Sequence, residues 1–355
     1  METLTILLTG VGAPGASSII NCLRNNGERD LRIIGIDMNP YAVCRNKVDK
    51  FYRVPGANDS SFINSVIEIC RDEQVQVLLP IVTRELELFA SNKCAFESIG
   101  TKIAVMDPQP LHIANNKGLL LSAMKAAALP TAQFVVVNDV KAVEEAVFRL
   151  GYPEKPVIVK PTVGNGSRGT RVLDATKSRY EQFFFEKPSS PVLRIEELMA
   201  ILKERTKIPE MIVMEFLPGQ ELCVDVLADH GKIAYISSRV GVAVSSIMQT
   251  NEVKLVPEAI KLATRVVELL NLSGNIDFDM KSDSTGIPHV LEINPRLPAG
   301  IAVEAIAGIN FPYLGIKQLL GEELPRCNIR EGVKMQFCNS ELFFDECNNP
   351  IYWNK

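Results

Sequence analysis

The sequence predicts an α/β fold in which an open parallel sheet is followed by two mixed α+β lobes. Three observations lead to this fold class. Apolar strand patterns alternate with helix patterns up to about residue 108, the proline-containing segment MDPQP interrupts the alternation, and hairpin-like strands follow one another from about residue 211. Alternating strands and helices are typical of parallel βαβ units, whereas strands in direct succession predict antiparallel pairing.

The first region, residues 1–108, contains four expected strands and three expected helices. The strands are LTILLT, LRIIGID, VQVLLPIV and KIAVM, and the helices are ASSIINCLRNN, SFINSVIEICRDE and RELELFASNKCAFESI. Each helix pattern separates two strand patterns, as βαβ units require. We therefore expect one parallel sheet with a domain boundary near residue 108, where the prolines lie.

Two further regions follow this boundary. Residues 109–210 contain the helix pattern LHIANNKGLLLSAMKAAA, the strand AQFVVV, a helix at about 139–150, the strand PVIVKP, a glycine-rich loop and a longer helical region. Residues 211–355 contain the strands MIVMEF, ELCVDVLAD and KIAYISSRV, a helix at about 256–271, and the strands NIDFDM and HVLEIN. These patterns predict the two α+β lobes.

Residues 10–15 read GVGAPG, which matches the G-x-G-x-x-G pattern of dinucleotide-binding turns. The motif lies between a predicted strand and a predicted helix, and Asp37 closes the next predicted strand about 20 residues on. The glycines would allow phosphate to approach a helix N-terminus closely. They suit equally a tight strand-to-helix turn in any doubly wound sheet. On the motif alone both interpretations stay open.

Composition excludes several classes of function. Apolar residues make up 46% and charged residues 23% of the chain, and the net charge is -4, so we expect no nucleic-acid partner. No apolar run approaches the roughly 18 residues of a membrane span, so we expect no membrane partner either. The eight cysteines contain no C-x-x-C pair and the three histidines lack zinc-ligand spacing. We expect a cytoplasmic protein with reduced thiols and a small-molecule partner.

The most informative stretch is NIDFDMKSDSTGIPHVLEINPR, residues 275–296, which reads as two strands joined by a polar turn. Because strand side chains alternate, Asp277 and Asp279 share one face of the first strand, and Glu292 and Asn294 share a face of the second. Asp277, Glu292 and Asn294 can therefore converge on one spot. Such oxygen ligands suit magnesium bound together with substrate phosphates. Arg296 can hold a carboxylate or a phosphate beside them. The alternative is the solvated face of an amphipathic hairpin.

A glycine-rich loop lies in the stretch VIVKPTVGNGSRGTRV. Lys160 ends an apolar strand there, and Gly164, Gly166, Ser167 and Gly169 follow it. Glycine amides can wrap phosphate oxygens, and Lys160 adds a positive charge beside them. The G-x-x-x-x-G-K-[ST] order is absent, which disfavours a P-loop nucleotidase. The alternative is a flexible hairpin connection.

A third element is VMEFLPGQELCVDVLAD, residues 213–229. Glu215 ends one strand before a Pro-Gly pair, and Glu221 begins the next strand. Such a link could contact adenine through backbone groups while Glu221 receives ribose hydroxyls. The alternative is an ordinary exposed strand.

Taken together, these stretches resemble the ATP-grasp superfamily, in particular single-unit relatives of the carbamoyl-phosphate synthetase large subunit and amino-acid (carboxylate-amine) ligases. The motifs V-K-P, G-x-G-S-x-G-T, E-F-L-P-G-x-E and L-E-I-N-P-R occur in the family's order and spacing over nearly the whole chain. The resemblance implies a Rossmann-like pre-ATP-grasp domain at 1–108. A linker helix with the N-terminal ATP-grasp lobe would occupy 109–210, and the C-terminal lobe and tail 211–355.

The resemblance also implies roles for individual residues, with ATP held between the two lobes. The expected ATP contacts are Lys117, Lys160, Gly166, Ser167, Gly169, Glu215, Phe216, Leu217 and Glu221. The expected ligands of two magnesium ions, with manganese as an alternative metal, are Asp277, Glu292 and Asn294. The expected catalytic residues are Lys160 and Arg296. Arg296 would contact the reacting carboxylate or acyl phosphate.

In this family the first turn of the pre-ATP-grasp domain borders the substrate side and need not bind a dinucleotide. Asp37 ends one predicted strand and Glu85 follows another, and ligands favour the carboxyl ends of strands in such sheets. We therefore expect these two carboxylates to shape a substrate pocket. Capping of the loops is the alternative role.

The chain departs from carbamoyl-phosphate synthetases in several respects. It contains one such unit and no glutaminase. Position 277 is Asp, which is closer to the pattern of D-alanine ligases, whereas carbamoyl-phosphate synthetases usually have Gln there. Asn116 precedes Lys117 where Asp is common. The expected function is an ATP- and magnesium-dependent ligase that activates a carboxylate, for example of an amino acid, as an acyl phosphate for attack by an amine.

Three alternatives stay open: a carbamoyl-phosphate-synthetase-like enzyme, a non-catalytic ATP-binding regulator, and an NAD-linked oxidoreductase that uses GVGAPG and Asp37. The expected partners are the small-molecule carboxylate and amine, and a homodimer is compatible with the resemblance.

Overall fold

The computed structural model describes residues 3–164, 166–187, 189–245, 248–337, 343–345 and 350–351. The chain divides into two compact units, which are described separately. The first contains Met1–Leu111, Leu222–Asp277 and Asn294–Lys355, and the second contains His112–Glu221 and Phe278–Ile293. The domain boundaries near residues 108 and 210 stay predictions. None of the described helices is long and apolar enough to cross a membrane.

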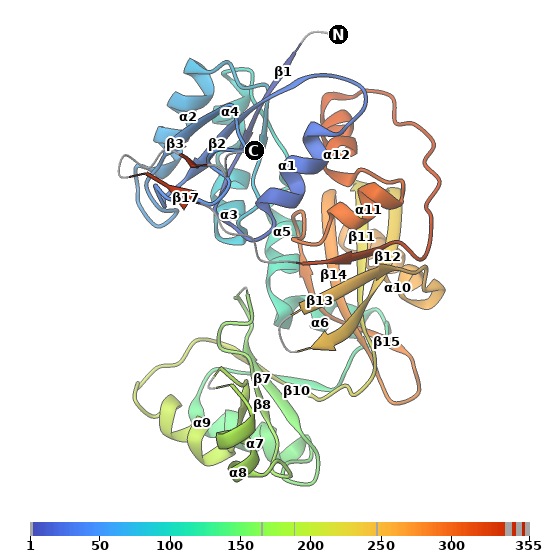
Figure 1. Ribbon diagram of the computed structural model, residues 1–355. Coiled ribbons are helices and arrows are strands. Elements are labelled where there is room, and N and C mark those ends of the chain that lie inside the picture. The colour runs from blue at the N-terminus through green and yellow to red at the C-terminus, as the bar shows by residue number, and fades with distance from the viewer. Residues whose placement is uncertain are drawn as a thin grey trace. The chain divides into compact units, whose positions relative to one another are not determined.

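The first unit contains a five-stranded parallel sheet with the order β3-β2-β1-β4-β5 (Figure 1). Its strands are β1 Leu4–Leu8, β2 Leu31–Asp37, β3 Lys50–Arg53, β4 Val77–Leu79 and β5 Lys102–Ile103. The helices between them are α1 Ala16–Arg24, α2 Phe62–Asp72, α3 Thr83–Ser91 and α4 Lys93–Glu97. This arrangement confirms the predicted α/β class and its Rossmann-like sheet. The strand expected over VQVLLPIV is shorter than predicted, because Pro80 cannot donate a ladder hydrogen bond.

The core of this sheet includes a helix from the far end of the chain. Helix α12, Phe311–Leu320, lies beside α1 (Figure 1), and both contribute to one buried apolar cluster with β1 and β2. Ile19 and Leu23 of α1 and Phe311 and Leu314 of α12 belong to this cluster. Each such side chain contributes about 1.5–3 kcal/mol by leaving water. The packing therefore joins the C-terminal segment to the first sheet.

A second sheet of six strands has the order β15-β14-β11-β12-β13-β16. The strands are β11 Glu221–Asp229, β12 Lys232–Ser245, β13 Met248–Val253, β14 Gly274–Ser282, β15 Pro288–Asn294 and β16 Lys334–Gln336. The accompanying helices are α10 Pro257–Leu270 and α11 Ala302–Ala307. The hairpin of β11 and β12 and the neighbouring pair β14 and β15 follow the predicted succession, whereas β13 and β16 were not predicted. Phe343–Phe344 (β17) and Pro350–Ile351 (β18) form a separate two-stranded ladder.

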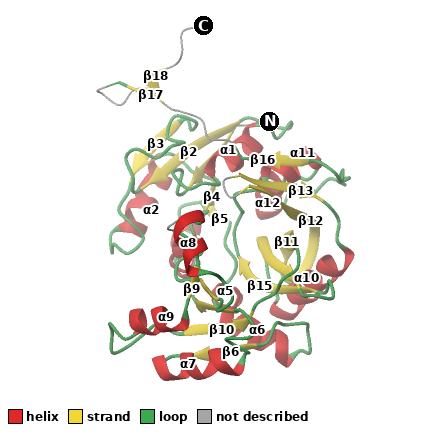
Figure 2. Ribbon diagram, turned by 60° about the horizontal axis from the view of Figure 1, so that its bottom comes forward, coloured by secondary structure: helices red, strands yellow, loops and turns green. Residues whose placement is uncertain are grey.

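The second unit contains a five-stranded sheet with the order β6-β10-β7-β8-β9. The strands are β6 Phe134–Val137, β7 Val157–Pro161, β8 Arg171–Leu173, β9 Val192–Leu193 and β10 Met211–Glu215. The later helices are α7 Val140–Arg149, α8 Arg179–Phe185 and α9 Ile195–Leu202. Helices α7 and α9 lie against the sheet (Figure 2) and bury Val143, Val147 and Leu198 with its strands.

The helix expected over residues 111–128 is divided in two, α5 Pro108–Asn115 and α6 Lys117–Ala126. Asn116 separates them, because its backbone is extended and its Oδ1 accepts a hydrogen bond from the Leu119 amide at 3.1 Å as an N-cap. The Lys117 amide donates to the Thr162 carbonyl at 2.9 Å. The break therefore places Lys117 at the start of α6 and beside the end of β7.

Candidate functional site

Two lysine side chains of the second unit are almost fully buried. Lys117 is 7% exposed and Lys160, on β7, is 6% exposed. Lys117 Nζ lies 3.0 Å from Glu292 Oε2 and donates to the Gly164 carbonyl at 3.0 Å, and Lys160 Nζ donates to the Leu291 carbonyl at 3.2 Å. Burial lowers the pKa of Lys160 to about 8, although the Glu292 carboxylate partly offsets this effect. A buried ammonium group whose charge is only partly offset would gain from an anionic partner.

The glycine-rich loop begins at this lysine pair. Gly166, Ser167 and Gly169 adopt the left-handed backbone region, with φ of 60°, 56° and 76°, and all three are exposed. Glycine reaches this region without steric cost, and consecutive turns of this kind direct backbone amides toward anions. The hydrogen bond from Lys117 to Gly164 fixes the start of the loop. The described part of this loop and the two lysines are the segments where the sequence predicts phosphate contacts.

The link between β10 and β11 places the residues expected at adenine and ribose. Glu215 Oε1 accepts from the Gln133 amide at 2.8 Å, and the Glu215 amide donates to the Gln133 carbonyl at 3.0 Å. Lys281 Nζ lies 5.1 Å from the ring centre of Phe216 and 3.7 Å from Glu221 Oε1. Glu221 is mostly exposed and available to a hydroxyl-bearing ligand.

The same link is packed closely against the end of β14. Leu217 is 3% exposed. The Gly219 amide donates to the Ser282 carbonyl at 2.9 Å, and a Cβ on Gly219 would lie 2.6 Å from that oxygen. Only glycine permits this approach, so the Pro-Gly pair holds the link at a fixed distance from the strand.

In the first unit, three predicted residues form a continuous hydrogen-bonded chain. Asp277 is 3% exposed, and its Oδ2 accepts from Asn294 Nδ2 at 3.1 Å. Asn294 Oδ1 accepts from Arg296 Nη2 at 3.0 Å, and Arg296 Nη1 donates to the Leu297 carbonyl at 3.0 Å. Asp277 Oδ1 accepts from Arg239 Nη2 at 3.0 Å. Sequence reasoning did not single out Arg239, which lies far from the hairpin along the chain.

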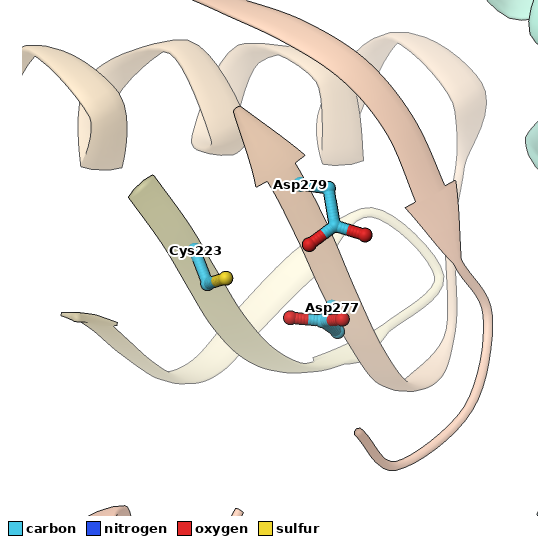
Figure 3. Close-up of side chains that lie close together, drawn as sticks. All are labelled: Cys223, Asp277 and Asp279. Carbon is cyan, nitrogen blue, oxygen red and sulfur yellow. The ribbon is translucent and has the colours of Figure 1, made fainter. Parts of the chain in front are cut away.

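Asp279 is a further carboxylate that the predicted ligand set lacked. Cys223 Sγ on β11 and one carboxylate oxygen each of Asp277 and Asp279 on β14 lie within 4.8 Å of one another (Figure 3). Asp277 and Asp279 share a face of β14 because strand side chains alternate. This alternation is visible in the sequence, so Asp279 could have been included among the predicted ligands.

The glycines of GVGAPG are in contact with other parts of the first unit. A Cβ on Gly10 would lie 2.3 Å from Val82 Cγ2, and a Cβ on Gly15 would lie 2.8 Å from Ala299 Cα. Ala299 follows Arg296 in the loop after β15. The absence of a side chain at Gly15 therefore allows this loop to pack on the first turn of the sheet.

The two carboxylates expected near a substrate differ in their environments. Asp37 Oδ2 accepts from the Gly12 amide at 2.7 Å and Oδ1 from the Asn39 amide at 2.8 Å, which supports a capping role. Glu85 is buried, and its Oε2 has no partner among the described residues. Burial raises the pKa of Glu85 to about 7, against a hydrogen bond with Thr9 that lowers it.

Gly15→Ala is expected to destabilise the protein by about 1–3 kcal/mol, because the added methyl group must displace the backbone at Ala299. The backbone of Gly15, with φ of -82°, is itself compatible with alanine. The control is Gly56→Ala, whose Cβ would meet nothing closer than 3.5 Å. Urea unfolding measures both free energies, and equal stability of the two variants would contradict the packing role.

Comparisons with known proteins found two family models that match parts of the chain. Residues 207–340 match the family model described as ATP-grasp in the biosynthetic pathway with Ter operon. Residues 6–104 match the family model described as PylC-like, N-terminal domain. A search of functionally curated proteins gave no match.

Solved structures with the same fold match nearly the whole chain. An N5-carboxyaminoimidazole ribonucleotide synthetase in complex with ADP matches with a TM-score of 0.66 and 18% identity, over 92% of this chain and 79% of that chain. The L-amino acid ligase from Bacillus licheniformis matches with a TM-score of 0.62 and 16% identity, over 90% and 74%. The biotin carboxylase domain of Hydrogenobacter thermophilus 2-oxoglutarate carboxylase, with MgADP, ADP and bicarbonate, matches with a TM-score of 0.68 and 16% identity, over 94% and 73%.

Proposed function

Because the chain belongs to the ATP-grasp superfamily, we propose that it is an ATP- and magnesium-dependent ligase that activates a carboxylate as an acyl phosphate for attack by an amine. The observation that carries this proposal is the buried pair Lys117 and Lys160 at the start of the glycine-rich loop. Ammonium groups held out of water beside the Glu292 carboxylate suit a phosphate chain bound with a divalent cation.

The second unit supplies the nucleotide contacts in this proposal. Lys117 and Lys160 hold the phosphates, and Gly166, Ser167 and Gly169 cover them with backbone amides. Adenine lies at Glu215 and at the backbone of Phe216 and Leu217, and ribose hydroxyls bind Glu221. The known ADP complex of the ribonucleotide synthetase and the MgADP complex of the biotin carboxylase domain support these ligands by analogy.

The donor set fits magnesium. The proposal includes two magnesium ions, with manganese as an alternative metal. Asp277, Asp279 and Glu292 offer carboxylate oxygens, which hard divalent cations prefer. Asn294 currently presents Nδ2 to Asp277 and Oδ1 to Arg296. As a ligand it would present its oxygen, which requires the amide to turn over. When bound, the metal offsets negative charge on the transferring phosphoryl group.

The protein's own residues then position the reactants. The substrate carboxylate pairs with Arg296, whose planar guanidinium can hold two oxygens. One carboxylate oxygen attacks the γ-phosphorus of ATP, the bond to ADP breaks, and Lys160 stabilises the charge that moves to the leaving group. The amine then attacks the acyl carbon, phosphate leaves and the amine loses a proton. Asp37 and Glu85 remain proposed substrate contacts, and a homodimer and a cytoplasmic location remain predictions.

The proposal predicts that ATP with magnesium raises the melting temperature of the protein, whereas NAD and NADP leave it unchanged. A ligand that binds only the folded state stabilises it by mass action, so the comparison is direct. ADP release across a panel of amino acids and amines then identifies the substrates, with hydroxylamine as a trap for the acyl phosphate. A shift with NAD and none with ATP would favour the oxidoreductase alternative and exclude this one.

A further inference from the structure

Arg239, on β12 of the first unit, is a buried arginine that bridges two buried carboxylates. It is 5% exposed, and Asp225 and Asp277 are 1% and 3% exposed. Its Nε donates to Asp225 Oδ2 at 2.8 Å and its Nη2 donates to Asp277 Oδ1 at 3.0 Å. Its Nη1 lies 3.5 Å from Asn251 Oδ1. All three nitrogens of the guanidinium therefore face oxygen atoms of different strands.

The guanidinium of Arg239 is closely packed by the loop after β15. A Cβ on Gly300 would lie 3.0 Å from Arg239 Nη1, so the loop after Arg296 packs directly on this group. The pairing of β11 with β12 places Arg239 opposite Cys223, one strand away from β14. The backbone thus fixes the point from which Arg239 reaches Asp277.

Stability alone is a weak reason for this arrangement. Buried ion pairs lose most of their attraction to desolvation, and apolar residues of similar volume often give equal or greater stability. One arginine between two carboxylates also leaves the group with a net negative charge. Oδ1 of Asp225 has no partner among the described residues, so the network is not fully satisfied as a structural element. An orienting role for Asp277 accounts for these features.

Building on the proposed function, we propose that Arg239 is a positioning residue that fixes the orientation of the Asp277 carboxylate for a divalent cation. Arg239 holds Oδ1 of Asp277, which leaves Oδ2 directed toward Asn294, another of the expected ligands. Only a planar guanidinium reaches Asp225 and Asp277 in one fixed geometry, because an ammonium group is a single point of charge on a flexible stem. Groups that orient metal ligands in this way commonly change metal affinity 10- to 100-fold when altered.

The test is Arg239→Lys, which keeps the positive charge but removes the planar guanidinium that reaches both carboxylates. The affinity for ADP is measured by calorimetric titration at a series of Mg²⁺ concentrations, for the wild type and for the variant. The quantity compared between the two proteins is the Mg²⁺ concentration at which ADP affinity has risen by half of its full Mg²⁺-dependent increase. We expect this concentration to rise about 10-fold or more in Arg239→Lys, with ADP affinity in the absence of Mg²⁺ unchanged. The control is Arg24→Lys, whose arginine pairs with the half-exposed Asp49 in the same unit and should behave as wild type.

The outcomes separate a positioning role from a structural one. A folded Arg239→Lys protein with the wild-type Mg²⁺ response would overturn the inference, because a purely structural residue changes stability without changing that response. If Arg239→Lys does not fold, Asp225→Asn provides the same measurement, since it loosens the guanidinium and leaves Asp277 in place. A wild-type Mg²⁺ response in Asp225→Asn would then overturn the inference. If the wild-type protein itself shows no Mg²⁺-dependent ADP binding, the proposed function fails, and this inference with it.

Discussion

Replacing Glu292 with glutamine is expected to lower substrate-dependent ADP release by about 10²- to 10³-fold while the protein remains folded. The substitution keeps the size of the side chain but removes one negative charge beside Lys117, whose Nζ lies 3.0 Å from Glu292 Oε2. A metal ion held by Glu292 would lose a ligand charge at the point where the phosphoryl group moves. ADP release and hydroxamate formation in the presence of hydroxylamine measure the loss.

The matched control is Glu186→Gln, the same change at a carboxylate of the second unit that is remote from the lysine pair in sequence and pairs with the exposed Lys177 at 3.3 Å. It should keep wild-type activity, because exposed ion pairs contribute little. Undiminished ADP and hydroxamate formation by Glu292→Gln would remove the metal from this strand, and most of the proposed mechanism with it.

The fold follows from local patterns to a large extent. Alternating strands and helices predicted the parallel sheet, and direct succession of strands predicted the hairpin of β11 and β12. Strand β3 and helix α12 were missed for different reasons. Strand β3 is short and half exposed, so it lacks an apolar run. Helix α12 lies after the L-E-I-N-P-R motif, where no helix was predicted, and packs against α1. The break at Asn116 was also missed, although asparagine is a common N-cap residue.

The candidate site was predictable where its residues lie close together in the sequence. Asp277, Asn294 and Arg296 belong to one hairpin and its exit, and the structure links them by hydrogen bonds. Arg239 could not be found in this way, because only the pairing of separate strands brings it to Asp277. The low pKa of Lys160 also depends on tertiary burial, which no local pattern encodes.

The motif GVGAPG shows the same limit. Its glycines match a dinucleotide fingerprint in spacing, but the spaces they leave are occupied by Val82 and Ala299. A pattern of glycines indicates that another group approaches the backbone closely, but it does not identify that group as a ligand or as protein. In this chain the neighbours are protein atoms.

Lys160→Met is expected to change ligand affinity and stability in opposite directions. Loss of the ammonium group removes a charge that would face the phosphates, so we expect ADP with magnesium to bind about 10-fold or more weakly. Stability at pH 7 should rise by about 1–3 kcal/mol, because the wild-type fold keeps a charged group in a desolvated place. The control Lys141→Met alters an exposed lysine of the same unit and should change neither quantity.

The pH dependence of unfolding stability distinguishes the buried charge of Lys160 from better packing of methionine as the cause of the stability gain. The pKa of Lys160 lies near 8 in the folded protein, below its ordinary value of 10.5, so between these values the unfolded chain binds more protons than the fold. The stability of the wild type should therefore gain from this residue as pH rises from 8 to 10.5, and Lys160→Met should lack that gain. Urea unfolding at several pH values measures both proteins, and the advantage of the variant should be full below pH 8 and fade toward pH 10.5. A constant difference across this range would show that the methionine acts through packing. In that case the desolvated charge of Lys160, which supports its assignment to the phosphates, would not be the cause of the difference.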